Sequence, residues 1–459
     1  MDDHRQLLNR LAALEREVAE LRQTLAERDA RIAELEEELR RRDKNYRPKP
    51  NAAPRKKSAD RRKKGQRRHG GFFRAPPKPA EVTHPHDVYA EACPHCNGHN
   101  LKATGKYDDH LQVDIPEPKI EVHRFRRYVM RCLDCDGTCQ GRGDLELPGS
   151  HIGPRARLLA AYARGHLGIS LGKTAALFSE WFGLRESRAG VLGHVKWAGK
   201  LCAPVVRKLL EILRRSSVVF ADETGWRING KNVWAWCFGN PQLAVYLIDQ
   251  RRNREVLTRT LGDSLPGVLV SDFYAVYDGI ACLKQRCLPH LLRELHRLRE
   301  ALPARSVSYY IQPVITLLQD AIELGKQRGK LSAKAFAAAR QSMYDRLDVL
   351  ILEKNPSNAD CVRIWKRLFK HCDELFTFLD HAEVPSDNSA CERDIRSVAA
   401  ARGDGGVNRT AWGASAFANI KSVVRTCQKQ SRSFMDYGLS LVRATLVGDA
   451  PPLPLPDTS

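Results

Sequence analysis

The 459-residue chain has no run of about 18 uncharged apolar residues, the minimum that a membrane-spanning helix requires. It also has no apolar secretory signal at its N-terminus, because the sequence there predicts a charged helix. These absences argue against a membrane protein and against a secreted one. We therefore expect an intracellular, cytoplasmic protein, and its 42% hydrophobic content is enough to build at least one large core.

Cysteine is sparse as well, because thirteen in 459 residues is far below the density of a disulfide-stabilised scaffold. Four of them form two Cys-x-x-Cys pairs, Cys93 with Cys96 and Cys132 with Cys135. Each pair could supply two corners of a tetrahedral Zn²⁺ site, and a glycine follows each pair after one intervening residue. The spacing predicts a zinc ribbon over 81–149 with structural Zn²⁺, in which Cys139 is a spare that could replace Cys135.

Acidic residues are in deficit, since 54 Asp and Glu face 75 Lys and Arg, for a net charge of +21. More than half of this excess lies between residues 41 and 75, and the prolines there predict a basic disordered linker over 43–80. We expect the linker to hold DNA phosphates without sequence preference, with a solvated solubility tail as the alternative. The expected phosphate-binding residues are Arg55, Lys56, Lys57, Arg61, Arg62, Lys63, Lys64, Arg67 and Arg68.

Residues 7–39 carry apolar side chains at alternating steps of four and three, with only Arg28 interrupting the seam. This heptad pattern predicts a coiled coil over 1–42. Charged residues flank the seam and could set partner choice, which favours a homo-oligomer joined through this helix. A helix that packs against its own chain is the alternative.

The remainder predicts a multidomain α+β protein. The region 150–215 has helix, glycine-containing turn and helix character, which fits either a helix-turn-helix DNA reader or a plain helical hairpin. We interpret 216–304 as the first part of an α/β core, 305–382 as a helical insertion and 383–446 as the last part of the core. The proline-rich residues 447–459 predict a disordered tail.

Within the core, the order of elements is informative. Strands are predicted at 218–228, 233–239 and 243–249, separated by Asn-Gly and Asn-Pro turn signals. A helix at 254–262 and a strand at 267–271 follow. A ribonuclease-H-like fold has this order of three strands, a helix and a strand.

Three acidic residues stand at the boundaries of these elements. Asp222 and Asp272 each close a strand-like run, and Glu392 lies at the opening of a predicted helix. A single aspartate at a strand end is usually a helix cap or a turn residue. Three carboxylates from distant segments can together hold two Mg²⁺ or Mn²⁺ ions for phosphodiester chemistry. We therefore predict that Asp222, Asp272 and Glu392 are metal ligands and catalytic residues.

Other residues nearby could join or replace these carboxylates. Glu223 should point to the opposite face of its strand, while Asp278 and Asp394 are competing acids. Cys287 and His290 have Cys-x-x-His spacing, but the lack of a partner pair nearby in the sequence argues against a second zinc site. His290 begins a predicted helix, where it either contacts DNA or a ligand carboxylate or only packs locally.

Taken together, these motifs resemble the transposases of the insertion sequence 66 family, which belong to the DDE class and have a ribonuclease-H-like catalytic core. The resemblance spans nearly the whole chain. It is carried by the coiled coil, the zinc ribbon and the segments 64–71, 222–227, 271–277, 285–290 and 388–396. It implies that Asp222, Asp272 and Glu392 are the metal-binding catalytic triad.

The resemblance also implies a bacterial, nucleoid-associated protein that binds the terminal inverted repeats of a mobile element and target DNA. Companion proteins of the same element are further candidate partners. Additional DNA contacts are expected near the motif segments, from His290, Arg293, Arg393, Arg396 and Arg402. One departure stands out, because the family usually has an Arg-Lys pair before a Gly-rich turn and this chain has Gly403 in place of the lysine.

Two other functions fit the same residues. A non-catalytic, zinc-dependent DNA-binding protein derived from a transposase would use the linker and the ribbon, with the core as a scaffold. A DDE-type nuclease would use the same metals and the same first step but would not transfer strands.

Overall fold

The structure is a computed structural model that describes residues 23, 26–27, 30, 77–403 and 407–455. The chain divides into two compact units, Met1–Ile115 and Pro116–Ser459. Most of the predicted coiled coil lies outside the described residues; the four described positions there are helical, and Gln23 donates a hydrogen bond to Glu27. The nine predicted phosphate-binding residues of the basic linker also lie outside the described part of the chain.

Two short cysteine-bearing segments belong to the region predicted as a zinc ribbon. In the first unit, the 3-10 helix η1 (Pro79–Glu81) precedes a tight turn that begins at Cys93. In the second unit, an antiparallel hairpin is formed by β1 (Val129–Arg131) and β2 (Thr138–Gln140). The second cysteine pair lies in the turn of this hairpin.

Three helices follow the hairpin, namely α2 (Pro154–Gly165), α3 (Leu171–Phe182) and α4 (Arg188–Leu213). Their boundaries follow from local chemistry. The hydroxyls of Ser170 and Ser187 accept hydrogen bonds from main-chain N–H groups at the starts of α3 and α4. Gly183, with a φ of 64°, ends α3 in the left-handed conformation that glycine adopts without strain. The predicted helix, turn and helix are therefore present.

The centre of the second unit is a mixed sheet with the strand order β5-β4-β3-β6-β7. Its elements are β3 (Val218–Ile228), β4 (Lys231–Gly239), β5 (Ala244–Asp249), α5 (Arg254–Leu261), β6 (Ser264–Ser271), η2 (Ala275–Gly279) and β7 (Ala281–Arg286). β3, β4 and β5 form an antiparallel meander, while β6 runs parallel to β3 and β7 runs parallel to β6. The predicted strands and helix are all present, and β7 is a further strand that the sequence pattern did not reveal.

The turn between β3 and β4 explains how the meander begins. Asn229 and Gly230 have φ values of 50° and 75°, as a two-residue type I′ hairpin requires. Asparagine and glycine tolerate these angles better than other residues. The turn sets the register in which Asp222 lies opposite Cys237.

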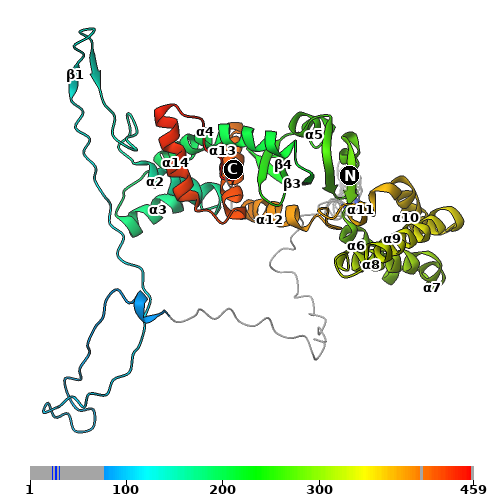
Figure 1. The fold of residues 1–459 in the computed structure, drawn as a ribbon, viewed down its shortest axis with the longest axis horizontal. Helices are drawn as coiled ribbons and strands as arrows, with labels where there is room; N and C mark the ends of the chain where they lie inside the picture. The colour runs from blue at the N-terminus through cyan, green and yellow to red at the C-terminus, as the bar shows by residue number, and fades with distance from the viewer. Residues whose placement is uncertain (1–22, 24–25, 28–29, 31–76, 404–406, 456–459) are drawn as a thin grey trace, which may run out of the picture. The chain divides into compact units, whose positions relative to one another are not determined.

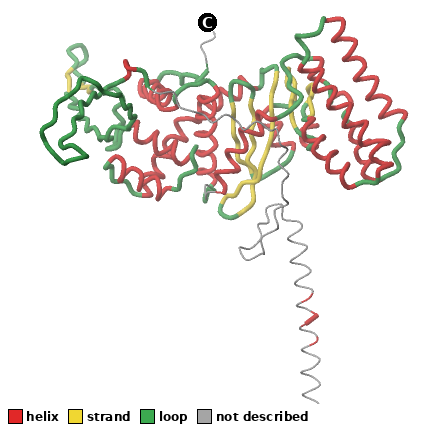
Figure 2. Tube along the Cα trace, turned by 90° about the horizontal axis from the view of Figure 1, so that it is seen from below, coloured by secondary structure: helices red, strands yellow, loops and turns green. Residues whose placement is uncertain are grey.

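Successive residues of β3 pack alternately into two separate hydrophobic cores. Phe220 and Trp226 belong to a core that continues into the helices after β7. Val219 and Ala221 belong to a second core, which includes residues of α4 and of the C-terminal helices. Figure 2 shows the strands lying between two groups of helices. Because a strand has a period of two residues, neighbouring positions on β3 face different environments.

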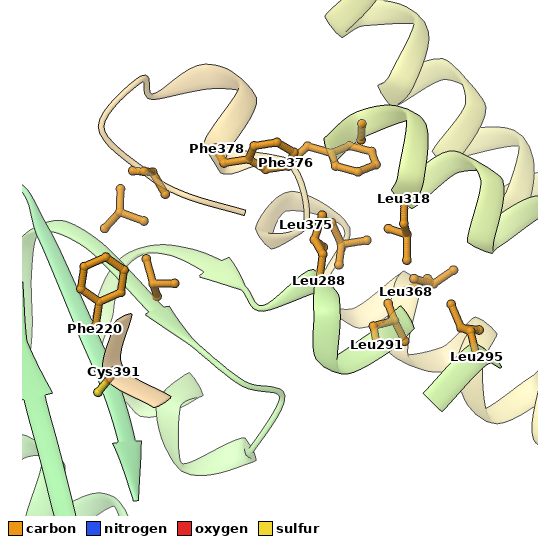
Figure 3. Packing of buried hydrophobic residues seen from close by; sticks show 14 of the residues in the cluster. Phe220, Leu288, Leu291, Leu295, Leu318, Leu368, Leu375, Phe376, Phe378 and Cys391 are labelled. Atoms are coloured by element: carbon orange, nitrogen blue, oxygen red, sulfur yellow. The ribbon is translucent and has the colours of Figure 1, made fainter. Parts of the chain in front are cut away.

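The helices that directly follow β7 are α6 (Leu288–Ala301), α7 (Ala304–Ser306), η3 (Val307–Ile311), α8 (Gln312–Lys326), α9 (Ala333–Asp348), η4 (Val349–Glu353), α10 (Ala359–Lys370), η5 (Cys372–Glu374) and α11 (Thr377–Asp380). Most of them fall in 305–382, the region predicted as a helical insertion, whereas α6 lies before it. In Figure 3, Leu288, Leu291 and Leu295 of α6 lie near Leu318 of α8 and Leu368 of α10. The spacing of these leucines along α6 fixes the rotation of that helix.

Three helices complete the second unit, α12 (Ser389–Gly403), α13 (Ala411–Lys429) and α14 (Phe434–Val447). α4 and α13 lie side by side near the sheet (Figure 1). They approach closely at Gly199, where an added Cβ would lie only 2.5 Å from the Cβ of Ala416. Glycine at this position permits the close approach.

The residues after α14 are placed by packing, which corrects part of the predicted disordered tail over 447–459. Leu453 and Leu455 pack against the second core, and Tyr437 donates a 2.8 Å hydrogen bond to the main-chain oxygen of Pro452. The prediction is therefore wrong for residues 448–455, because proline-rich chain can still bury apolar side chains on a folded neighbour. Residues 456–459 lie outside the described part of the chain. Among the described residues, no helix combines the length and the apolar character needed to cross a membrane.

Candidate active site

Asp222 lies in the middle of β3, on the face that also carries Phe220. Burial is the main cause that raises the pKa of Asp222 to about 7, and the negative charges of Glu223, Asp272 and Glu392 act in the same direction. A 2.9 Å hydrogen bond from the main-chain N–H of Glu223 to Oδ1 opposes this rise. The side chain is therefore held in a partly buried position where negative charge accumulates.

Asp272 follows β6 directly, and the parallel pairing of β3 with β6 brings it beside Asp222. Phe220 of β3 is paired with Val270 of β6. Asp222 and Asp272 each come two residues after their member of this pair, so they lie at the same level of the two strands. Oδ1 of Asp272 accepts a 2.9 Å hydrogen bond from the main-chain N–H of Tyr274, which orients the carboxylate. Neighbouring parallel strands thus present two carboxylates at the point where their pairing ends.

Glu392 lies in the first turn of α12, and two features fix that turn against the sheet. Asn388, which is 1% exposed, donates a 2.8 Å hydrogen bond from Nδ2 to the main-chain oxygen of Ala221. Cys391 is buried beside Phe220, as Figure 3 shows, and its thiol donates to the main-chain oxygen of Cys237. The residue after Cys391 is therefore directed to the end of the sheet where Asp222 lies.

These contacts bring the three predicted carboxylates within electrostatic reach of one another. Asp222 comes from a central strand, Asp272 from the end of its parallel neighbour, and Glu392 from a helix that begins more than 100 residues later. The charges of Asp272 and Glu392 each add to the rise in the pKa of Asp222, after burial and the charge of Glu223. Carboxylates that repel one another can hold divalent cations, since a cation offsets the repulsion.

The acids that could have competed with this triad are neutralised elsewhere. Glu223 points to the opposite face of β3, as predicted. Its side chain is only 2% exposed, and its Oε1 lies 2.5 Å from Nη2 of Arg252. Asp394 is 2% exposed and contacts Arg425 and Lys429 of α13 at 2.7 and 2.8 Å. These two acids are therefore buried ion-pair partners, and their charges are compensated away from the triad.

Arg252 is a residue that the sequence analysis did not identify. Its guanidinium lies 4.3 Å from the ring centroid of Trp234 and 4.1 Å from that of Tyr274, while it also pairs with Glu223. Tyr277 donates a hydrogen bond to the same carboxylate. The cluster packs around Glu223, the residue after Asp222 on β3. No sequence signal marks Arg252, because its partners lie far from it along the chain.

Arg286 supports Asp272 in a similar way. It is fully buried at the end of β7, and Nη1 donates to the main-chain oxygen of Asp272 at 2.9 Å. Nε donates to Glu374 at 2.6 Å, and Nη2 donates to Asp278. Burial by itself would raise the pKa of Glu374, but a hydrogen bond from His371 and the charge of Arg286 lower it to about 2. One guanidinium therefore links the Asp272 loop to the helical insertion.

Asp278, His371 and Glu374 also form a group whose ligand atoms lie within 4.8 Å of one another. The buried charge of Arg286 already occupies this group, and Lys370 lies 2.6 Å from Asp278. A metal ion there would have to displace two cations. The group is therefore a salt-bridge network and not a candidate metal site.

The predicted DNA-binding residues of the core are in different environments. Arg293 on α6 and Arg393 and Arg396 on α12 are exposed. His290 lies in the first turn of α6, with Nδ1 3.3 Å from Oε1 of Glu392. Arg402 is half-buried and donates a 2.6 Å hydrogen bond to the main-chain oxygen of Gly225, so it joins α12 to β3.

The two cysteine pairs have the same local geometry. In the first, the N–H of Cys93 donates to Gly98 O at 2.9 Å; in the second, the N–H of Cys132 donates to Gly137 O at 2.7 Å. Main-chain hydrogen bonds from within each turn are the main cause that lowers the pKa of the Cys93 and Cys132 thiols. Both turns thus favour the thiolate form that binds zinc.

Comparison with known proteins gives a match for the region of the candidate active site and another for the cysteine pairs. Residues 150–416, more than half of the chain, match the family described as "Transposase IS66 family". Residues 90–136 match the "zinc-finger binding domain of transposase IS66", a range that includes all four predicted zinc ligands. These matches define the chain as a transposase with a zinc-finger domain. It belongs to the IS66 family.

One curated relative is also similar to the chain. It is described as "Uncharacterized protein y4hP" from Sinorhizobium fredii (strain NBRC 101917 / NGR234). The two are 23% identical over 373 residues, which covers 73% of this chain and 67% of the relative. The relative's description assigns no activity.

Proposed function

We propose that this protein catalyses metal-dependent cleavage and strand transfer of DNA, with Asp222, Asp272 and Glu392 as its DDE triad. The observation that carries the proposal is the convergence of these three carboxylates from three separate elements. The pKa of Asp222 is raised mainly by burial and by the charge of Glu223. The charges of Asp272 and Glu392 raise it further. The carboxylates of Asp222 and Asp272 each accept a main-chain hydrogen bond, and the buried amide of Asn388 holds the start of the helix that carries Glu392.

The strand topology supports a ribonuclease-H-like core. An antiparallel meander is followed by a helix and two parallel strands, in the spatial order β5-β4-β3-β6-β7. The central strand of the sheet carries the first aspartate, and the next parallel strand carries the second. This is the arrangement that the DDE class uses, so the fold and the site agree.

The chemistry of the donors fits Mg²⁺ or Mn²⁺. All three proposed ligands are carboxylates, and these ions prefer oxygen ligands. Bound divalent ions would activate the attacking oxygen and stabilise the leaving oxygen. The protein's own contribution is to position the ligands, through Asn388 for the start of α12 and through Arg286 for the Asp272 loop.

The proposed reaction has two steps. A water oxygen attacks the phosphorus at an end of the element, and the 3′ oxygen leaves as a hydroxyl. That 3′-hydroxyl then attacks a phosphorus of the target DNA, forming one phosphodiester bond and breaking another. No covalent bond to the protein is formed in either step.

DNA would be held by residues from several regions. Arg293, Arg393 and Arg396 are exposed on α6 and α12, the helices that also carry His290 and Glu392, and would contact phosphates there. The nine basic residues of the linker would add sequence-independent affinity. Arg402 fits a supporting role better, because its guanidinium already donates to Gly225.

The remaining parts of the proposal concern zinc and assembly. Cys93, Cys96, Cys132 and Cys135 are the proposed structural Zn²⁺ ligands, supported by the zinc-finger match and by the identical turns. The heptad pattern in 1–42 supports a homo-oligomer joined by a coiled coil. The element ends and target DNA are the proposed substrates.

The test is an assay of cleavage and joining on labelled DNA from the ends of the element, with Mg²⁺ and with Mn²⁺. Asp222→Asn, Asp272→Asn and Glu392→Gln should each abolish both reactions while DNA binding persists. Glu300→Gln, an exposed acid on α6, is the matched control and should retain activity. Cleavage without joining would favour a nuclease, and binding without either reaction would favour a non-catalytic DNA-binding protein.

A further inference from the structure

Cys287, His290 and Glu392 converge at the junction of β7, α6 and α12. Their ligand atoms all lie within 4.8 Å of one another. Oε1 of Glu392 is 3.3 Å from Nδ1 of His290 and 3.8 Å from Sγ of Cys287. Sequence spacing alone argued against zinc at this Cys-x-x-His pair, because no second pair lies nearby. The missing third ligand instead comes from a helix about 100 residues further along the chain.

We propose that Cys287, His290 and Glu392 form a binding site for a transition-metal ion of the Zn²⁺ class. A tetrahedral Zn²⁺ with bonds of about 2.0–2.3 Å separates its ligand atoms by roughly 3.3–3.6 Å. The separations of Glu392 Oε1 from His290 Nδ1 and from Cys287 Sγ, 3.3 and 3.8 Å, are close to these values. Only small side-chain movements are therefore needed to close the site around an ion.

The backbone holds these three ligands in place without a metal. The N–H of Cys287 donates a 2.8 Å hydrogen bond to Ser271 O, which extends the pairing of β6 with β7. The N–H of Asn388 donates to the sulfur of Cys287 at 3.3 Å, which ties the start of α12 to the same residue. The buried leucines of α6 fix the helix that carries His290. A preorganised ligand set loses little conformational entropy when an ion binds.

The state of His290 is a second observation that points to a ligand. Its Nδ1 is buried and makes no hydrogen bond of acceptable geometry, although Glu392 lies close by. A buried ring nitrogen without a partner is costly, and coordination would satisfy it. The side chains of His290 and Glu392 are 35% and 24% exposed, so an ion can enter from solvent and keep a water as its fourth ligand.

The ligand types distinguish this site from the proposed Mg²⁺ site. A thiolate and an imidazole suit Zn²⁺, Co²⁺ and Cd²⁺, whereas Mg²⁺ prefers oxygen. Glu392 is common to both sites, so the consequence for catalysis rests on the proposed function. The binding itself does not, because it can be measured without DNA and without turnover.

The experiment uses the full chain, stripped of metal and reloaded with one equivalent of Zn²⁺ per chain, which the four cysteines of the zinc finger take up before a site with three protein ligands does. Co²⁺ is then added and the thiolate-to-cobalt charge-transfer absorption is recorded. Zn²⁺ holds its tetrahedral sites more tightly than Co²⁺, so the zinc finger should not exchange. We expect one further Co²⁺ per chain with a thiolate band, and a second calorimetric titration with Zn²⁺ should show the same stoichiometry.

Cys287→Ser should abolish the thiolate band, and His290→Gln should weaken binding by at least about 10- to 100-fold. Cys427→Ser is the matched control, because Cys427 is equally buried but lies in the other core. Asp222→Asn should also retain the band, since Asp222 is not a ligand of this site. Far-ultraviolet circular dichroism checks that each variant is folded.

Two results would overturn the proposal. If the wild-type chain shows no thiolate band and binds no additional ion, Cys287 and His290 only support Glu392 by hydrogen bonding. If binding survives Cys287→Ser and is lost in Asp222→Asn, the ion occupies the carboxylate triad. Failure of strand cleavage with an intact thiolate band would instead count against the proposed function alone.

Discussion

The amide of Asn388 donates a 2.8 Å hydrogen bond to the main-chain oxygen of Ala221, the residue directly before Asp222. This contact joins the start of α12 to the centre of β3, so the first and third members of the proposed triad are held by one buried side chain. Asn388 is 1% exposed, and removal of its amide leaves the oxygen of Ala221 without this donor.

Asn388→Ala is therefore expected to destabilise the fold by about 1–3 kcal/mol, the cost of an unsatisfied buried acceptor. Displacement of Glu392 should lower the cleavage rate further, by about 100-fold, a loss that misplacement of about 1 Å can cause. Urea unfolding and single-turnover cleavage measure the two effects.

Asn419→Ala is the control for this variant, since its amide also donates to a main-chain oxygen, that of Gly199, at 3.2 Å. It should lose some stability and keep its cleavage rate. If both variants lose activity in proportion to stability, Asn388 has no special role in placing Glu392.

Arg286→Gln should be among the most destabilising substitutions in the core. The change leaves the carboxylates of Asp278 and Glu374 without their buried cation, which costs about 3–5 kcal/mol. Arg346→Gln removes an exposed contact with Asp320 and should cost less than about 1 kcal/mol. Denaturant midpoints of the two variants give the comparison, and equal midpoints would contradict the prediction.

The stability of the protein without added Mg²⁺ should fall as pH rises from about 4 to about 7. The pKa of Asp222 is about 7 when folded and about 3.9 in an unfolded chain, so between these values the folded state holds a proton that the unfolded state has lost. Mg²⁺ should offset this loss, since it binds the ionised carboxylates, and its stabilising effect should be larger at pH 8 than at pH 5.

The measurement is the urea midpoint at pH 5 and pH 8, with and without Mg²⁺, for wild type and Asp222→Asn. Asparagine does not ionise, so the variant should lack this part of the pH dependence. An identical pH dependence in both proteins would show that Asp222 titrates normally.

Zinc content should depend on the two cysteine turns. Cys93→Ser and Cys132→Ser are each expected to lower the tightly bound zinc, measured by atomic absorption after desalting, and to weaken the cysteine-bearing region toward proteolysis. Cys139 is exposed on β2, outside the turn that Cys132 begins. Cys139→Ser should retain zinc where Cys135→Ser does not, and the opposite result would assign Cys139 as the ligand.

Much of the fold could be predicted because its signals are local. The Asn229-Gly230 turn and the strands on either side of it depend on residues within a few positions of one another. β7 was missed because its pattern is short and half exposed, and it becomes a strand only beside β6. The tail was misjudged because the apolar surface that holds Leu453 is formed by distant helices.

The sequence by itself determined the chemistry that is available: the cysteine pairs at zinc spacing, the basic excess, and three acids in or next to strands and a helix. Tertiary structure alone decided which acids lie together and which are neutralised. Arg252 pairs with Glu223 and Arg286 supports Asp272, while Cys287 and His290 meet Glu392. The physical reason is distance along the chain, since each contact joins elements whose meeting depends on strand order and helix packing and leaves no local pattern.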